Sequence, residues 1–179
     1  ETARQLGMEN YRQLFSPETE LGRWLMARNT MLRIGRNLFV HAVLSARLLE
    51  RDLEIETLNA RMSEGLYRTS KERKEDPTLE FLYRSAGPIW YRGMVCADEK
   101  YDPLTPEQTG ALLRRYDADR LLVGHTIFPD ISTFHDGRVI AVNVQNDLNR
   151  RKNRGRAVLI EGSRISVVGN RGVKRVLEE

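Results

Sequence analysis

The sequence predicts an α/β fold with a mixed sheet and helices covering at least one sheet face. Two short apolar runs, residues 37–40 and 120–124, end at polar residues and have the length of buried strands. Capping signals that contain proline, together with helical periodicity, mark helices before and between these runs. Beyond residue 130, turn dipeptides between apolar runs predict β-hairpins. The expected order is therefore helices, strands, helices and then hairpins.

The composition is that of one soluble globular domain. Of its 179 residues, 40% are hydrophobic and 30% are charged, and the formal charge is +4. No apolar run approaches the ~18 residues of a membrane span, so we expect no membrane partner. The lone Cys96 excludes an internal disulfide and fits a reducing compartment, which favours a cytoplasmic location. The sequence opens at Glu1 rather than methionine, so an upstream targeting segment and a periplasmic location stay open.

Helices and a hairpin are expected in the first third of the chain. Ser16 followed by Pro17 has the form of an N-cap and a first helical residue. Leu21 and Trp24, three residues apart, give this helix an apolar face. The expected elements are a helix over residues 2–15, a helix from residue 17 to about residue 29, and strands Met31–Ile34 and Asn37–Val40 joined by Gly35-Arg36.

Three further helices are expected in the middle of the chain. Asp76-Pro77 repeats the N-cap and proline signal, and Thr105 with Gln108 has the form of a capping box. The charged segment 68–75 predicts a solvated surface. A single long helix is expected over residues 45–66, with a buried face made of Leu48, Ile55, Leu58, Met62 and Leu66.

The last third is expected to consist of strands. Asp136-Gly137 and Gly162-Ser163 are two-residue turn signals. A basic loop, residues 149–155, separates them. The predicted hairpins pair residues 132–135 with 138–142, and residues 156–161 with 164–168.

Two histidines, His41 and His125, each follow one of the short apolar runs. Ligands of open α/β sheets bind at the carboxyl ends of the strands, so the two imidazoles are expected side by side at one edge of the sheet. They do not complete a metal site, because zinc takes three or four protein ligands. Each could instead be a hydrogen-bonded structural residue. His135 precedes a hairpin turn, is expected to be exposed, and is not a candidate.

Four segments, in order along the chain, resemble the calcineurin-like metallophosphoesterases, and within them the bacterial branch of Shewanella-like protein phosphatases. Residues 33–41, Arg-Ile-Gly-Arg-Asn-Leu-Phe-Val-His, resemble the "IGDTLFVHGG" segment of that family, and residues 15–25 resemble what precedes it. Residues 87–93 resemble "GPxWYRG", and residues 123–126 resemble the "VGHT" metal motif. The resemblance extends from about residue 6 to residue 145.

The resemblance implies the C-terminal part of the metallophosphatase α/β/β/α sandwich, with a mixed sheet followed by β-hairpins. It also implies two divalent metal ions, manganese, iron or zinc, with His41 and His125 as ligands of the same ion. Arg92 is then a catalytic residue that clamps phosphate, since a guanidinium group matches phosphate oxygens bidentately. The alternative for Arg92 is a surface arginine stacked on Trp90 or Tyr91.

The departures from the family pattern concern most of the metal ligands. The motifs GDxHG, GDxxDRG and GNHE supply those ligands, the bridging carboxylate and the general acid, and none occurs here. The resemblance therefore implies that residues 1–179 are the C-terminal portion of a single metallophosphoesterase domain, whose N-terminal half is a missing partner. Ala42-Val43 also stand where the family has Gly-Gly, which brings the loop geometry and the activity into question.

The function implied by the resemblance is hydrolysis of phosphomonoesters, on proteins or small molecules, by a metal-bound hydroxide. The full-length protein would be the enzyme, and this chain alone would be inactive. The alternative is a non-catalytic phosphatase-like scaffold that binds a partner or a phosphorylated ligand. A third class, a nucleic-acid-binding module using the basic residues 150–156, is not favoured because that loop lacks aromatic residues for base stacking. Cys96 is expected to be a small buried hydrophobe rather than a metal ligand.

Overall fold

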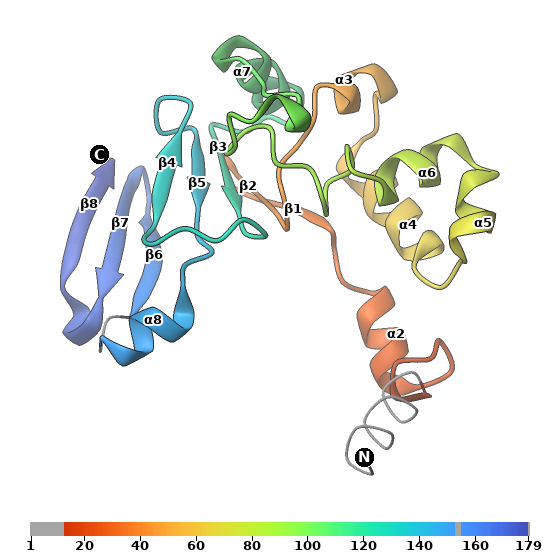
Figure 1. Ribbon diagram of the computed structural model, residues 1–179, viewed down its shortest axis with the longest axis horizontal. Helices are drawn as coiled ribbons and strands as arrows, with labels where there is room; N and C mark the ends of the chain where they lie inside the picture. Colours follow the sequence, from red (N-terminus) through yellow and green to blue (C-terminus); the bar gives the residue numbers. More distant parts are fainter. Residues whose placement is uncertain (1–12, 153–154, 179) are drawn as a thin grey trace.

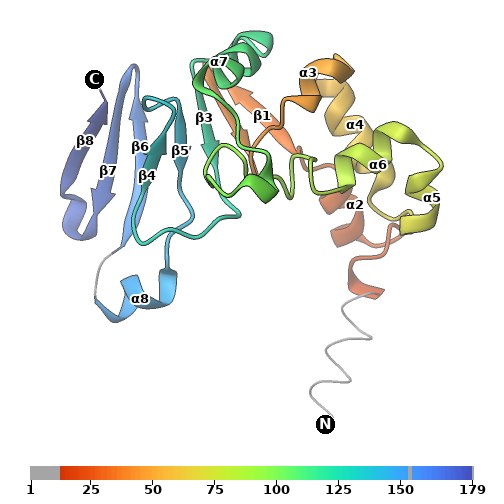
Figure 2. The same ribbon diagram turned by 45° about the horizontal axis from the view of Figure 1, so that its top comes forward.

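The computed structural model describes residues 13–152 and 155–178 (Figure 1). The predicted helix over residues 2–15 lies almost wholly outside this range. The described part contains a five-stranded mixed sheet and a separate three-stranded antiparallel sheet. In Figures 1 and 2 the helices α4 and α6 lie on the side of the larger sheet opposite to the three-stranded sheet. The predicted α/β class is confirmed.

The larger sheet has the strand order β1-β2-β3-β5-β4. Its first two strands, β1 (Met31–Ile34) and β2 (Asn37–Val40), form the predicted hairpin, in which Gly35 takes a φ of 58°. The next strand, β3 (Arg120–Val123), runs parallel to β2. Because parallel neighbours end at the same edge of a sheet, the residues that follow β2 and β3 are brought together.

The other edge of this sheet is the hairpin of β4 (Ser132–Phe134) and β5 (Val139–Ala141). β5 also runs parallel to β3. The hairpin was predicted, but the two-residue turn was wrong, because residues 135–138 all lie between the paired strands. Positive φ values at His135, Asp136 and Gly137 produce this wider connection.

Helices cover one face of the sheet and build the main core. Every second residue of a strand faces this layer, as a period of two requires. Leu38, Leu121 and Val139, one from each of three neighbouring strands, are fully buried against it. The capping signals at Asp76 and Thr105 form as predicted. The helices of this layer are α3 (Arg47–Arg51), α4 (Ile55–Gly65), α5 (Ser70–Lys74), α6 (Pro77–Tyr83) and α7 (Pro106–Arg115).

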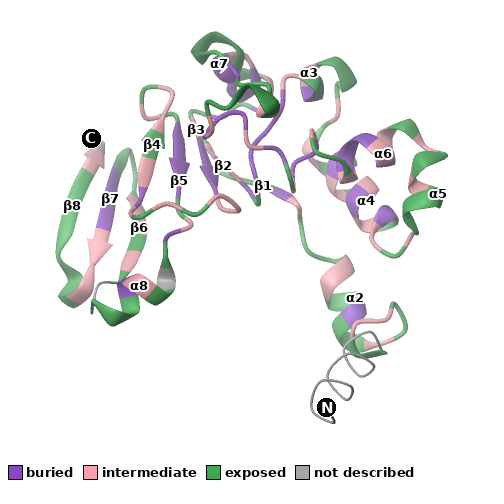
Figure 3. Ribbon diagram, in the orientation of Figure 1, coloured by how far each residue is buried: buried purple, intermediate pink, exposed green. Residues whose placement is uncertain are grey.

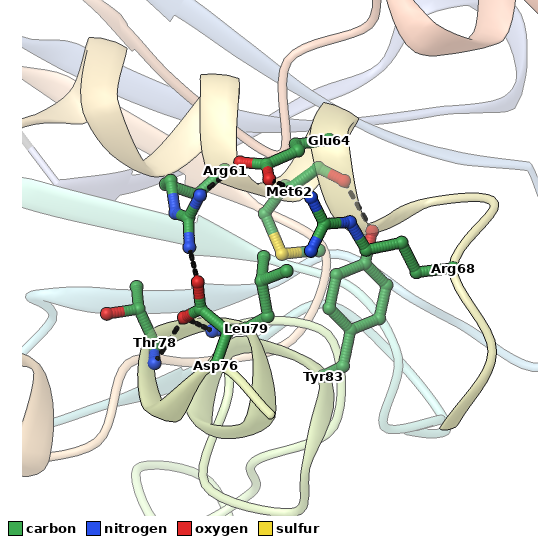
Figure 4. A network of polar contacts seen from close by, with 8 residues as sticks. All are labelled: Arg61, Met62, Glu64, Arg68, Asp76, Thr78, Leu79 and Tyr83. Carbon is green, nitrogen blue, oxygen red and sulfur yellow. Dashed lines mark hydrogen bonds and ion pairs between the residues drawn. The ribbon is translucent and has the colours of Figure 1, made fainter. Parts of the chain in front are cut away.

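A network of charged residues joins α4 to the start of α6 (Figure 4). Arg61 contacts both Glu64 and Asp76, and Glu64 also contacts Arg68. Asp76 accepts hydrogen bonds from the backbone N–H groups of Thr78 and Leu79, at 2.9 and 3.1 Å. Asp76 therefore caps α6 and holds it against α4.

Two helix predictions were wrong in detail, and the charged segment that was predicted to be a solvated surface is largely exposed and also contains a helix. The long helix over residues 45–66 is two helices, because Asp52 takes a φ of 46° and ends α3. The helix α2 (Glu20–Met26) begins after Thr19 rather than Ser16, since the Thr19 hydroxyl accepts from Gly22 N–H at 3.0 Å. The charged segment 68–75 contains the short helix α5, which starts with a capping box at Thr69.

The second sheet consists of β6 (Arg156–Glu161), β7 (Arg164–Gly169) and β8 (Lys174–Glu178). The β6–β7 hairpin was predicted, and β8 was not. Ile165 and Val167 pack with Leu122 and Ile140 on the second face of the larger sheet. A short helix, α8 (Asn146–Arg151), includes the first three residues of the predicted basic loop 149–155. The described part also contains the 3₁₀ turns η1 (Glu99–Tyr101) and η2 (Asn170–Gly172).

The second face of the sheet is covered unevenly. The three-stranded sheet packs over β3 and β5, whereas on β1 Leu32 and Ile34 are 41% and 59% exposed. A mainly apolar cavity of about 830 Å³ begins beside these strands, lies between α2 and the sheet, and extends to His41. Figure 3 shows exposed and half-buried positions along α2 and part of β1. No helix among the described residues is long and apolar enough to cross a bilayer.

Candidate functional site

His41 and His125 meet at one rim of the larger sheet. Val40 and Val123 are register partners, so the residues that follow them lie at the same edge. His41 Nε2 and His125 Nδ1 are 3.2 Å apart, and the ring centroids are 5.0 Å apart. The proximity expected from the two apolar runs is therefore present.

The backbone at His125 is unusual for a residue with a side chain. Its φ is 59°, in the left-handed region that L-residues rarely occupy. The N–H of Thr126 donates a 2.6 Å hydrogen bond to the carbonyl of Gly124, which closes a tight turn around the histidine. Such strain persists only where surrounding structure enforces it, and it is concentrated at functional sites.

The His125 ring is partly buried and favours the neutral form. Burial is the main cause of its lowered pKa, and the charges of Arg92 and His41 act in the same direction. A backbone group of Trp90 opposes these effects. Nε2 is buried and has no hydrogen-bond partner of good geometry among the described residues. A neutral imidazole keeps a lone pair for a metal ion or a proton.

Arg92 points toward the same rim. Its Nη1 donates a 2.9 Å hydrogen bond to the Thr126 hydroxyl, and its positive charge helps to lower the pKa of His125. Of the two aromatic residues before it, Trp90 contacts the His125 ring at this rim, and Tyr91 is buried. The arrangement therefore supports an Arg92 directed into the site by Thr126, a residue that the sequence analysis did not single out.

The turn at residues 87–93 places Arg92 and Trp90. Only glycine fits at position 87, because a Cβ there would lie 2.1 Å from the carbonyl oxygen of Leu82. The same turn accepts a hydrogen bond from Ala42 N–H at Pro88 and one from Val43 N–H at Tyr91, at 3.0 and 3.3 Å.

The departure from Gly-Gly at positions 42 and 43 is accommodated structurally. Ala42 and Val43 are each only 1% exposed. Neither is among the residues with positive φ, so glycine's conformational freedom is not needed there. The question that this departure raised about the loop geometry is thus answered, whereas its effect on activity is a matter for assay.

Other polar candidates are occupied elsewhere. His135 was expected to be exposed, and this was wrong: it is half-buried, with Nε2 2.9 Å from the Met94 carbonyl and Nδ1 3.3 Å from the Thr109 hydroxyl. Cys96 is partly buried against the core, as expected of a small hydrophobe. Asp130 pairs with Arg156.

The described residues supply an incomplete set of metal ligands. Within residues 13–152 and 155–178, no three or more His, Cys, Asp or Glu side chains form a group that could hold an ion. His41 and His125 fit two ligands of one ion, because metal–nitrogen bonds of ~2.0–2.1 Å place adjacent ligand atoms roughly 3–3.5 Å apart. The 3.2 Å separation of their facing nitrogens is within this range. The role of the pair as ligands remains a prediction.

Comparison with known proteins gives matches among solved structures alone. No protein-family model and no curated protein sequence matches the chain. A cold-active protein tyrosine phosphatase matches with a TM-score of 0.84 and 28% identity, over 94% of this chain and 48% of that one. The crystal structure of a cold-active protein-tyrosine phosphatase from a psychrophilic Shewanella species matches with a TM-score of 0.83 and 27% identity, with the same coverage.

These matches support a relationship between this chain and phosphatases. They agree with the mixed sheet and the separate hairpin sheet described above. The chain spans about half the length of the structures that it matches.

Proposed function

We propose that the polypeptide containing this chain is a metal-dependent phosphomonoester hydrolase. The observation that carries the proposal is the convergence of His41, His125 and Arg92 at one rim of the sheet. The similarity to protein tyrosine phosphatases supports the same reaction class. In this proposal the cofactors are two divalent ions, manganese, iron or zinc, and the two histidines are ligands of one of them.

Each residue of the site has a distinct task. Metal ions, when bound, neutralise phosphate charge and lower the pKa of water toward ~7, which makes hydroxide available at neutral pH. Arg92 presents a planar fork of N–H donors to two phosphate oxygens. The Thr126 hydroxyl holds that fork at the rim before substrate arrives. The lowered pKa of the partly buried His125 favours the neutral ring, which keeps one nitrogen lone pair for a metal ion rather than repelling a cation.

The proposed substrates are phosphate monoesters on protein side chains, with small phosphomonoesters as the second class. The matching structures are those of protein tyrosine phosphatases. Phosphotyrosine peptides are therefore the first substrates to assay.

The proposed partner is the half of the domain that supplies the remaining ligands. Two histidines cannot hold two divalent ions, and the described residues offer no third ligand beside them. The proposed partner half would cover an apolar surface of this chain. That surface consists of the exposed Leu32 and Ile34 and the apolar cavity of about 830 Å³. Open apolar surfaces of this kind mark interaction sites on soluble proteins. On this proposal the 179-residue chain alone is catalytically silent.

The experiment compares the 179-residue chain with the polypeptide extended by its upstream sequence. Both are assayed with manganese and a chromogenic phosphomonoester, and bound metal is counted. We expect two ions and turnover in the extended protein, and neither in the chain alone.

His41→Ala and His125→Ala should each remove bound metal, and Arg92→Ala should weaken substrate binding without unfolding. Arg92→Lys should also bind substrate more weakly than wild type, because lysine offers a point charge rather than a planar fork of donors. Arg114→Ala, on the exposed side of α7, is the control.

The alternative is a phosphatase-like scaffold that binds a partner or a phosphorylated ligand without turnover. Its distinguishing result would be an extended protein that binds phosphate through Arg92 but holds no metal.

Binding of nucleic acid by the basic residues of α8 is not expected. A salt-sensitive interaction with RNA that is lost in Arg151→Glu would contradict that expectation.

A further inference from the structure

Trp90 is a large apolar side chain left open beside the proposed phosphate site. It is 54% exposed, although its neighbour Tyr91 is 5% exposed. Its ring meets the His125 ring edge to face, with centroids 5.6 Å apart and planes at 85°. The indole thus contacts His125, while about half of the side chain's surface faces solvent.

The backbone around Trp90 is fixed on both sides. The N–H groups of Trp90 and Tyr91 both donate to the carbonyl of Gly87 at 3.1 Å. The Tyr91 hydroxyl donates to the carbonyl of Asp102. At Gly93, a Cβ would lie 2.1 Å from the Tyr91 hydroxyl oxygen, so this close packing requires glycine. An aromatic surface held in this way contacts a ligand at little cost in conformational entropy.

The position of Trp90 relative to Arg92 defines what the indole can contact. Arg92 directs its guanidinium group to Thr126, while Trp90 touches the ring of the preceding residue, His125. A phosphate bound between Arg92 and the histidines would therefore lie beside the exposed indole. Ile127, which follows Thr126 in the sequence, is a second exposed apolar residue, at 60%.

We infer that Trp90 is a specificity-determining residue that selects aryl phosphomonoesters over alkyl ones. The inference rests on the proposed function, since it needs the phosphate at Arg92. The aromatic ring of the substrate's alcohol contacts the indole face in an offset or edge-to-face arrangement. Aromatic pairs of this kind, beyond burial, correspond to a preference of about three- to tenfold. An aryl phosphate can be a free small molecule or a phosphotyrosine side chain.

The test uses Trp90 as its own reporter in the 179-residue chain. The sequence contains two tryptophans, so Trp24→Phe leaves Trp90 as the sole indole fluorophore. This protein is titrated with inorganic phosphate, glycerol phosphate, phenyl phosphate and a phosphotyrosine peptide, with and without manganese. Calorimetry measures the affinities of the Trp90→Leu and Trp90→Phe variants for the same ligands. Because the side chain is half exposed, these substitutions leave the core intact.

We expect phenyl phosphate to bind about three- to tenfold more tightly than glycerol phosphate and to change the Trp90 fluorescence. Trp90→Phe should keep the preference, and Trp90→Leu should lose it while binding inorganic phosphate unchanged. A peptide that binds more tightly than phenyl phosphate indicates a protein substrate, and equal binding indicates a free aryl phosphate.

The experiment distinguishes a failure of the proposed Trp90 role from a failure of the phosphate site. Equal affinity for phenyl and glycerol phosphate, with binding that still depends on Arg92, overturns the role of Trp90 and leaves the phosphate site in place. Absence of any anion binding in the polypeptide extended by its upstream sequence, with manganese present, or binding there that is unaffected by Arg92→Ala, overturns the phosphate site itself and the inference with it.

Discussion

The backbone N–H of Gly124 donates a 2.9 Å hydrogen bond to the carbonyl of His41, which ties together the loops that carry the two histidines. A Cβ on residue 124 would lie 3.3 Å from the same oxygen. Gly124→Ala should therefore move the two loops apart by a few tenths of an ångström. Because ligand geometry tolerates little displacement, we expect a several-fold loss of metal affinity in the polypeptide extended by its upstream sequence, with about 1 kcal/mol or less lost in stability. Calorimetric titration and urea unfolding measure the two effects, and unchanged metal affinity would contradict the prediction.

Substitutions at His125 should separate backbone strain from side-chain chemistry. The φ of 59° is tolerated by asparagine and disfavoured for a β-branched residue. We expect His125→Val to cost roughly 1–2 kcal/mol more than His125→Asn, although both remove the imidazole. Urea unfolding of the two variants gives the difference, and equal stabilities would show that the turn relaxes without cost.

Thr126 should act on phosphate through Arg92. Thr126→Val removes the hydroxyl that accepts the 2.9 Å hydrogen bond from Arg92 and keeps the side-chain shape. We expect phosphate affinity to fall by about two- to tenfold, which corresponds to one hydrogen bond of ordinary strength. Thr126→Ser keeps the hydroxyl and is the matched control. A loss of equal size in both variants would contradict the role of the hydroxyl, because Thr126→Ser keeps it.

Two glycines should respond to alanine in opposite directions. At Gly87 a Cβ would clash with backbone, the Leu82 carbonyl oxygen, so we expect Gly87→Ala to cost about 1–3 kcal/mol or more. At Gly110, inside α7, the nearest atoms are the mobile guanidinium ends of Arg114 and Arg138, at 3.3 and 3.4 Å. Gly110→Ala should therefore stabilise by about 0.5–1 kcal/mol through helix propensity. Thermal and urea unfolding provide the comparison.

Asp76 should make stability depend on pH in the acid range. Its hydrogen bond with Arg61 is the main cause of its lowered pKa, and backbone N–H groups of α6 add to it (Figure 4). Because the folded pKa lies below the unfolded value of 3.8, the stabilisation is complete above that pH and is lost as the pH falls through the folded pKa. Asp76→Asn should therefore lower the urea midpoint at neutral pH, and the gap to wild type should close in acid. Asp76→Ala, which also removes the cap, should lower the midpoint further.

The elements that sequence predicted well are those set by local chemistry. Gly35-Arg36 specifies a tight connection, and the caps at Asp76 and Thr105 act within one turn of their own helices. The start of α2 at Thr19 was missed because Ser16-Pro17 gives the same type of capping signal three residues earlier. The break at Asp52 was missed because periodicity records which face is apolar and not where the backbone leaves the helix. β8 was missed because its strand character depends on pairing with β7.

The residues of the site also differ in how far the sequence predicted their positions. His41 and His125 were predicted to meet because each ends an apolar run and neighbouring parallel strands end together. The function of Thr126 depends on a contact with Arg92, 34 positions away, which no spacing rule indicates. Its place directly after His125 in the VGHT segment was the one available signal. The exposure of Trp90 depends on how residues 87–93 fold against Ala42 and Val43.

The parallel pairing of β2 with β3 also affects how the chain folds. It joins residues separated by 84 positions at the histidine pair, with only α-helices and turns between them. Closing so long a loop is entropically costly before the pairing contributes, and such non-local strand pairs slow folding. The helical segment between them forms its contacts locally and can precede the pairing. A fluorescence signal from Trp90 at the rim should therefore appear in the last kinetic phase of refolding, after the far-ultraviolet helical signal has largely recovered.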